Sequence, residues 1–116
     1  MQYLAVIHAD ENAWDRLPPA ERDTVLEEYT AFSNEPAVVD GAELQPTATA
    51  TTVRVREGET LVTDGPFADL KEAIGGYFLL ECSSIDEACD WAARIPAARH
   101  GAVEVRPVHV DEEEQS

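Results

Sequence analysis

The sequence predicts one α+β domain with a ferredoxin-like βαββαβ arrangement, because strand-like and helix-like segments alternate in that order along its 116 residues. Two short apolar runs, residues 3–7 and 77–82, have the pattern of central strands buried on both faces. A helical segment follows each run, and an alternating hairpin lies between the two halves. A chain of this length forms one core, so residues 1–110 are expected to be a single domain.

The first helix is expected over residues 20–32. Pro18 and Pro19 precede it, and prolines suit the first turn of a helix. One face of this helix should pack on the sheet, since apolar side chains repeat at helical spacing: Val25, Leu26, Tyr29 and Phe32. Residues 33–48 are expected to be a connection with a short strand near Leu44.

A hairpin is predicted from two β-rich stretches, residues 51–56 and 60–63, which the Glu-Gly pair at 57–58 separates. The first stretch alternates strictly, so its two sides differ. We expect its valines to face the core. Arg54 and Arg56 then share the opposite face, where a dimer contact or solvent suits them better than a ligand.

The second half begins with Asp-Gly-Pro-Phe at residues 64–67, which should close the hairpin and lead into a short helix over residues 68–73. Gly75 and Gly76 are expected to end that helix. The buried strand at residues 77–82 follows.

A further helix should start at Ser84, because Ser84 and Glu87 have the spacing of a capping box, and it should run until Pro96. Residues 103–106 alternate as a last strand, and residues 111–116 are expected to be a solvated, mobile acidic tail. Helices would then cover only one sheet face. The other face needs a cover, for which a second copy is the usual solution, so we expect a homodimer.

The charge balance makes some partners improbable. Asp and Glu number 24 against 8 Lys and Arg, which gives a formal net charge of −16 and no basic cluster for nucleic acid. A salt-rich cytoplasm and an Arg-biased, GC-rich genome would each explain this composition. The apolar N-terminal run is too short for a signal peptide or membrane span, so a cytoplasmic protein is expected. Cys82 and Cys89 are expected to be buried as small apolar side chains rather than joined in a disulfide.

Residues 62–72, Val-Thr-Asp-Gly-Pro-Phe-Ala-Asp-Leu-Lys-Glu, followed by Gly-Gly-Tyr at 75–77, resemble the signature of the DGPF branch of the YCII-related family. The segments 92–98, 103–107 and 44–46 are also similar to that family. The resemblance implies a ferredoxin-like protomer that pairs into a dimer of the dimeric α/β-barrel type. It also implies a cleft between helices and sheet.

Two functions are considered. The cluster of polar and aromatic groups around the Asp-Gly-Pro-Phe turn suggests binding or transformation of a small anionic or aromatic molecule there. The resemblance implies that some YCII relatives are enzymes that use a His and an Asp. DGPF genes often lie beside those of extracytoplasmic-function sigma factors, which suggests a noncatalytic accessory protein with a sigma factor or another protein as partner. Two departures matter: residues 34–41 look shorter than is usual, and His8 stands where a Tyr is expected.

Asp64 is a candidate general base or ligand anchor, since Gly65 and Pro66 would hold its backbone rigidly. The alternative is a turn cap that binds nearby backbone amides. Lys71, the single lysine, lies beside Glu72 and could hold an anion or act as a base, or could form only a surface ion pair.

His8 ends the first strand two residues before Asp10, so the two side chains could share one side and transfer a proton, or His8 could be purely structural. Phe67 and Tyr77, together with Lys71 and Glu72, are the expected ligand-binding residues of the same corner. We find no spacing typical of metal ligands and no nucleotide or phosphate motif, and therefore expect no metal and no cofactor.

Overall fold

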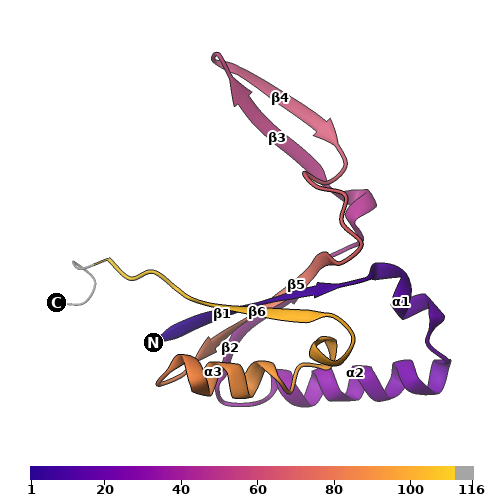
Figure 1. Cartoon of the computed structure of the whole chain (residues 1–116), viewed down its shortest axis with the longest axis vertical. Helices are drawn as coiled ribbons and strands as arrows, with labels where there is room; N and C mark the ends of the chain where they lie inside the picture. The colour runs from indigo at the N-terminus through magenta and orange to yellow at the C-terminus, as the bar shows by residue number, and fades with distance from the viewer. Residues whose placement is uncertain (112–116) are drawn as a thin grey trace.

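The computed structural model describes residues 1–111, and four of its strands form one antiparallel sheet (Figure 1). The remainder of the expected acidic tail lies outside the described residues. In order across the sheet, the strands are β2 (Val38–Glu43), β5 (Ala73–Glu81), β1 (Gln2–Ala9) and β6 (Ala102–Pro107). This order, with every neighbouring pair antiparallel, is the ferredoxin-like arrangement that the sequence predicts.

Three helices connect these strands: α1 (Glu11–Arg16), α2 (Pro19–Ser33) and α3 (Ile85–Ala92). Two short 3-10 turns accompany them, η1 (Thr47–Thr49) and η2 (Pro96–Arg99). Helices α2 and α3 lie on the same side of the sheet (Figure 1). The opposite side of the sheet, which we call the open face, is covered by no helix of the described residues.

The core lies between the sheet and these two helices. Every second residue of β1 is buried, so the strand is confirmed but the prediction that both of its faces are buried is wrong: one face lies on the core and the other on the open face. Leu80 of β5 and Ile95 after α3 are completely buried, and the ring of Phe32 from α2 packs edge-on against Phe78 with centroids 4.8 Å apart. Burial of each such side chain contributes about 1.5–3 kcal/mol.

The capping box at the start of α3 is confirmed. The Ser84 side chain accepts a hydrogen bond from the Glu87 amide, and the Glu87 carboxylate accepts one from the Ser83 amide. The predicted end at Pro96 is wrong, since the helix ends at Ala92 and Pro96 instead opens η2. Proline has no backbone donor to lose in the first turn of a new helical segment.

The predicted hairpin is confirmed as β3 (Thr51–Arg56) paired with β4 (Glu59–Asp64), but these two strands pair only with each other. We call residues 51–64 the arm, because they project from the rest of the chain, the body (Figure 1). The expectation that the valines face a core is wrong: Val53 and Val55 are each 60% exposed. The Cα radius of gyration is 16.6 Å, whereas a compact chain of this length has about 13 Å.

The predicted helix over residues 68–73 is also wrong. That segment is irregular, and β5 begins at Ala73 and continues through Gly75 and Gly76. A Cβ at Gly76 would lie 2.6 Å from the carbonyl oxygen of Ala42. Gly76 therefore permits close approach of β2 rather than ending a helix.

The two cysteines differ in exposure. Both are free thiols, and Cys82 is buried as predicted, but Cys89 is exposed, so that part of the prediction is wrong. Cys89 follows the buried Ala88 on α3, and adjacent positions of a helix point in different directions.

Candidate functional site

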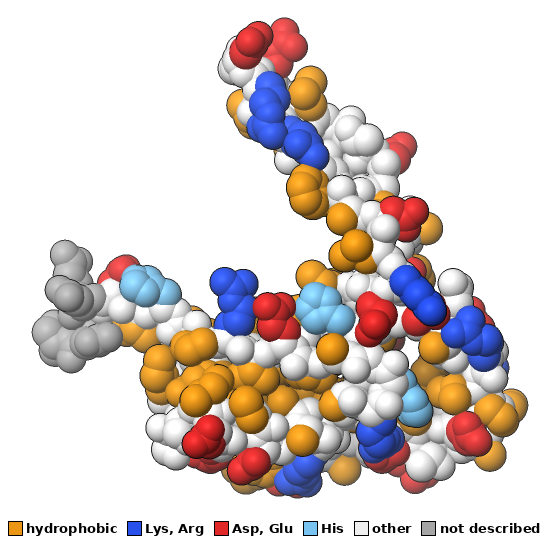
Figure 2. All heavy atoms as spheres, in the orientation of Figure 1, with side chains coloured by type: hydrophobic (Ala, Val, Ile, Leu, Met, Phe, Trp, Pro, Cys, Tyr) orange, Lys and Arg blue, Asp and Glu red, His pale blue; other side chains and the backbone are white. Residues whose placement is uncertain are grey.

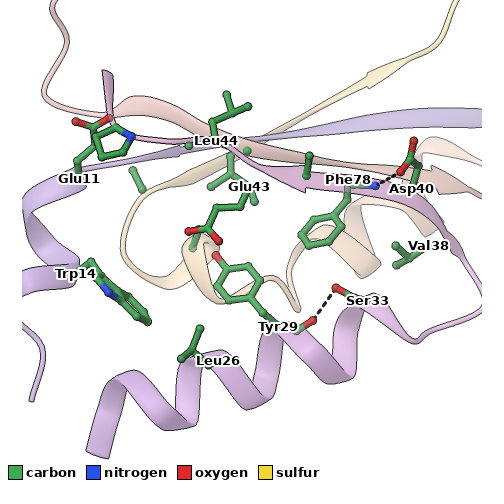
Figure 3. A pocket seen from close by; sticks show the side chains of 18 of the residues that line it. Glu11, Trp14, Leu26, Tyr29, Ser33, Val38, Asp40, Glu43, Leu44 and Phe78 are labelled. Atoms are coloured by element: carbon green, nitrogen blue, oxygen red, sulfur yellow. Dashed lines mark hydrogen bonds between the residues drawn. The ribbon is translucent and has the colours of Figure 1, made fainter. Parts of the chain in front are cut away.

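A cleft of about 660 Å³ opens on the helix side of the sheet, between the β2–β5 edge and helices α1 and α2 (Figure 3). Trp14, Leu26, Tyr29, Leu44 and Phe78 form much of its wall. A volume of this size holds one small molecule, and a largely apolar wall with a few polar groups is typical of ligand sites.

Helix α1 supplies one end of the cleft, and polar contacts hold it in place. Asp10 caps the helix by accepting a hydrogen bond from the Asn12 amide at 2.9 Å, and Arg16 donates to the same carboxylate at 3.1 Å. These contacts, the Asn12 amide first, hold the pKa of Asp10 below its usual value. Glu11 accepts hydrogen bonds from both the backbone amide and the hydroxyl of Thr47, at 2.7 and 2.9 Å.

The Glu11–Thr47 contact has a structural consequence. Glu11 lines the cleft, while Thr47 begins the η1 turn that leads directly to the arm. The wall of the cleft and the root of the arm are therefore tied together by one carboxylate.

The polar centre of the cleft is formed by Tyr29 of α2 and Glu43 of β2, whose polar ends point toward each other (Figure 3). Burial raises the pKa of the Tyr29 hydroxyl, and the Glu43 carboxylate shifts that pKa in the same direction, against an opposing backbone hydrogen bond. Tyr29 thus stays protonated near neutral pH and can donate a hydrogen bond. Its ring lies nearly parallel to that of Phe78, with an interplanar angle of 20°.

The charge of the cleft is negative. Its lining includes five carboxylates and, among the described residues, no Lys, Arg or His: the carboxylates belong to Asp10, Glu11, Asp15, Asp40 and Glu43. Asp10 and Glu11 are already engaged as described above, and Asp40 accepts a hydrogen bond from the Gly41 amide. No described residue donates a hydrogen bond to the Glu43 side chain. Glu43 is therefore available to a ligand, and an anion would be repelled.

Glycines form part of the cleft wall. A Cβ added at Gly75 would meet no atom within 4 Å, so the backbone there borders open space. Gly75 lies where the pairing of β1 with β5 shifts register between Ile7 and His8. A larger side chain at this position should narrow the cleft without a backbone clash.

None of the six site residues predicted from the sequence lines this cleft. Two of them lie at or just beyond the end of the arm: Asp64 is the last residue of β4, and Phe67 is 77% exposed with the Arg54 guanidinium 4.9 Å above its ring. The turn after β4 is held by the Gly65 amide, which donates to Ala50, and by the Thr52 hydroxyl. No hydrogen bond to the Asp64 side chain occurs among the described residues.

The other four predicted residues belong to the body. His8 lies on the open face, where its Nε2 is 3.2 Å from Glu104 Oε1, and Asp10 instead binds Asn12 and Arg16. Tyr77 on β5 and Glu104 on β6 both pair with Val6 of β1, so the side chains of Tyr77, Glu104 and Val6 lie on the open face. Lys71 and Glu72 are exposed immediately before β5. The structure thus brings His8 and Tyr77 onto one face and leaves Asp64 and Phe67 apart from it.

Sequence reasoning missed Trp14, Tyr29 and Glu43 as a site. Tyr29 was expected on the core face of its helix, and Glu43 in a connection, because periodicity does not distinguish a cleft wall from a core. Within residues 1–111 no group of three His, Cys, Asp or Glu side chains could hold a metal ion. No helix in this part of the chain is long and apolar enough to cross a membrane.

Comparisons with known proteins give three findings. The family profile of the YCII-related domain matches residues 1–110. An uncharacterized protein of Rhizobium meliloti (strain 1021) is 35% identical over 114 residues, which cover 93% of this chain and 92% of that protein. A solved structure with a TM-score of 0.55 covers 97% of this chain and 98% of its own at 14% identity. It is the 5-chloro-2-hydroxyhydroquinone dehydrochlorinase TftG of Burkholderia phenoliruptrix AC1100, in complex with 2,5-dihydroxybenzoquinone.

Proposed function

The chain belongs to the YCII-related domain family, and from this membership and its cleft we propose that it binds and transforms a small, uncharged aromatic molecule that carries hydroxyl or carbonyl groups. The observation that carries the proposal is the Tyr29–Glu43 pair inside a wall of aromatic side chains. The structural neighbour, whose likeness concerns the fold, is named for a hydroquinone and was solved with a quinone. This supports the same class of ligand.

The aromatic side chains would hold the ring of the ligand. Trp14 and Phe78 line the cleft together with Tyr29, and aromatic pairs contribute about 0.5–1.5 kcal/mol beyond burial. Between the two ligand classes expected from the sequence, the cleft favours an aromatic molecule over an anion, because carboxylates are its only charged groups within the described residues.

Glu43 and Tyr29 would act on the polar substituents. Glu43 accepts the proton of a ligand hydroxyl, and the electron pair of that O–H bond stays on the ligand oxygen. The neutral Tyr29 hydroxyl donates a hydrogen bond to a second ligand oxygen, where negative charge collects. Such a proton transfer needs no cofactor.

Binding is tested by titrating the protein with hydroquinone and, separately, with benzoate while tryptophan fluorescence, to which Trp14 in the cleft contributes, is followed. Hydroquinone should bind and benzoate should not. Glu43→Gln and Tyr29→Phe should each weaken hydroquinone binding about tenfold, since each loses one polar contact to the ligand. Gly75→Val should abolish binding with the fold intact.

Matched controls separate this cleft from the site that the sequence predicts. Glu27→Gln on the exposed side of α2 and Tyr77→Phe on the open face should leave binding unchanged. If Tyr77→Phe and Asp64→Asn abolish binding while Glu43→Gln does not, the cleft is not the site and the Asp-Gly-Pro-Phe corner is.

A noncatalytic accessory role is the second candidate, and the formal net charge of −16 favours it, because such a charge steers a basic protein partner. Pull-downs at low and high salt test this role. A partner that is recovered only at low salt supports it, and recovery of none counts against it.

A further inference from the structure

The polar side chains that line the cleft are mostly acceptors of hydrogen bonds. Its five carboxylates accept and do not donate, and its other polar side chains, within the described residues, are those of Trp14, Tyr29 and Ser33. The Ser33 hydroxyl already donates to the backbone carbonyl of Tyr29 at 2.9 Å. No Lys or Arg of residues 1–111 lines the cleft, and Figure 2 shows these side chains spread over the arm and the outer surface of the body. A ligand therefore meets more acceptors than donors.

Glu43 is the acceptor that lies best placed for a ligand. Three of the other carboxylates accept hydrogen bonds from the protein, those of Asp10, Glu11 and Asp40. The two that accept none within the described residues belong to Asp15, on α1, and to Glu43, the last residue of β2. Of these two, Glu43 points its carboxylate toward the hydroxyl of Tyr29 (Figure 3).

The position of Tyr29 opposite Glu43 is held by packing. The centroid of the Tyr29 ring lies 6.4 Å from that of Phe78, and the Phe78 ring packs in turn against the buried Phe32. Rings that pack on a dense core keep a defined orientation. A donor on α2 and an acceptor on β2 therefore face a ligand in a fixed relation.

A ligand oxygen beside Glu43 must carry a proton. A hydroxyl there donates to the carboxylate, whereas a carbonyl oxygen sets its lone pairs against those of the carboxylate and leaves both without a partner. A simple quinone has only carbonyl oxygens, and the hydroquinone of the same ring has only hydroxyls. Tyr29 can donate to either form, so of this pair only Glu43 distinguishes them.

We infer that Glu43 determines the specificity of the cleft, which selects the reduced, hydroxylated form of an aromatic ring over its oxidised quinone form. This inference rests on the proposed function and narrows its ligand from hydroxyl or carbonyl groups to hydroxyl groups. An acceptor left without a partner weakens binding, so a hydroquinone should bind at least about tenfold more tightly than its quinone.

The preference has an electrochemical consequence. Reduction of a quinone takes up two electrons and two protons and gives the hydroquinone. A site that binds the hydroquinone tenfold more tightly raises the midpoint potential of the bound couple by about 30 mV. This shift provides a second measurement that does not depend on the heat of binding.

Calorimetric titration in the absence of oxygen tests the inference, with hydroquinone and 1,4-benzoquinone as the two ligands. Both are titrated into Cys89→Ala, because quinones add to exposed thiols and Cys89 is the exposed one of the two cysteines. Hydroquinone should bind at least about tenfold more tightly. Glu43→Gln in the same background should remove this preference, because its amide can also donate to a carbonyl oxygen.

Two further variants make the result specific. Glu27→Gln is the matched control, since it removes the same charge from the exposed side of α2, and it should keep the preference. Glu43→Ala covers the case in which Glu43→Gln does not fold, as judged by circular dichroism. It removes the acceptor and adds no donor, so it should weaken the binding of hydroquinone but not that of the quinone.

Failure of the inference and failure of the proposed function give different results. If hydroquinone and quinone bind equally well while Glu43 is intact, or if the preference survives Glu43→Gln, the inference is overturned and the proposed function stands. Equal midpoint potentials for the free and the protein-bound couple would overturn the inference as well. If neither ligand binds, the proposed function fails and the inference fails with it.

Discussion

Leu80 in the body and Leu61 in the arm are both strand leucines, yet Leu80 is completely buried and Leu61 is 44% exposed. Leu80 lies on β5, which has a strand on each side and faces the core, whereas Leu61 lies on β4, which pairs only with β3. An alternating apolar pattern therefore predicts a strand but not what covers it. In this protein the helices of the body cover one face of its sheet, whereas no other described element pairs with the two strands of the arm.

The largest effect on stability is expected for a substitution in the core of the body. Leu80→Ala should lower the free energy of unfolding by about 2–5 kcal/mol, because it leaves a cavity in a closed core, and this loss should not depend on protein concentration. The same change in the arm, Leu61→Ala, should cost less than about 1 kcal/mol in dilute protein. Its cost should grow with concentration if a second copy covers the arm. Urea unfolding at two protein concentrations measures both, and equal costs in dilute protein would mean that the arm packs on its own body.

Two glycines sharpen the comparison, because they are required for different reasons. A Cβ at Gly41 in the body would lie 2.7 Å from the Phe78 ring, so Gly41→Ala should cost about 1–3 kcal/mol by overpacking. Gly58 at the tip of the arm meets no atom within 4 Å but has a φ of +79°. Gly58→Ala should therefore cost about 1 kcal/mol through backbone strain alone.

Asparagine distinguishes the two reasons, since it tolerates a positive φ better than alanine does. Gly58→Asn should recover part of the stability lost in Gly58→Ala, and Gly41→Asn should be worse than Gly41→Ala. Thermal unfolding of the four variants provides the measurement. Recovery at Gly41 would contradict the steric explanation.

The next smaller effect is expected at the contact between Glu11 and Thr47, which joins the body to the root of the arm. Glu11→Ala removes both hydrogen bonds that the cleft wall makes to Thr47 at the root of the arm. Opening of the η1 turn should become easier by about 1 kcal/mol. Hydrogen exchange of the Thr47 amide should then be roughly five- to tenfold faster, while exchange in the core of β5 should not change. Unchanged exchange at Thr47 would show that the arm root is held by other contacts.

The smallest effect is a pH dependence of stability that arises from the Glu28–Arg99 ion pair of the body. The Arg99 guanidinium, which donates two hydrogen bonds to Glu28, holds the pKa of that carboxyl below its ordinary value of 4.5. Since the folded pKa is lowered, this stabilisation is present above pH 4.5 and is lost as the pH falls through the folded pKa. The melting temperature of Glu28→Gln should therefore lie below that of the parent at pH 7 and approach it in acid. A difference that does not change with pH would contradict the assignment.

Short sequence patterns predict much of the fold. The apolar runs of β1 and β5 and the capping box at Ser84 each act within a few residues, and the structure has two central strands and a helix start at these places. The wrong helix over residues 68–73 shows where such signals fail. Gly76 permits close packing as readily as it ends a helix, and only the presence of β2 beside it decides between the two.

The candidate site was less accessible to sequence reasoning. Tyr29 and Glu43 lie in different elements, and nothing in their local sequence indicates that they meet. The sequence predicts other residues, such as Asp64 and His8, because of their chemistry and their neighbours in the chain. Their role as site residues stays a prediction.

The sequence by itself determined the strands β1, β3, β4, β5 and β6, the helix α2 and the start of α3, where the arm turns, and to which family the chain belongs, because these follow from periodicity, turn chemistry and a local signature. Only the tertiary structure decided that the valines of β3 are exposed and that Tyr29 faces Glu43 across a cleft. The physical reason is range: backbone preferences act between near neighbours in the chain, whereas burial and cleft formation depend on which distant segments pack together.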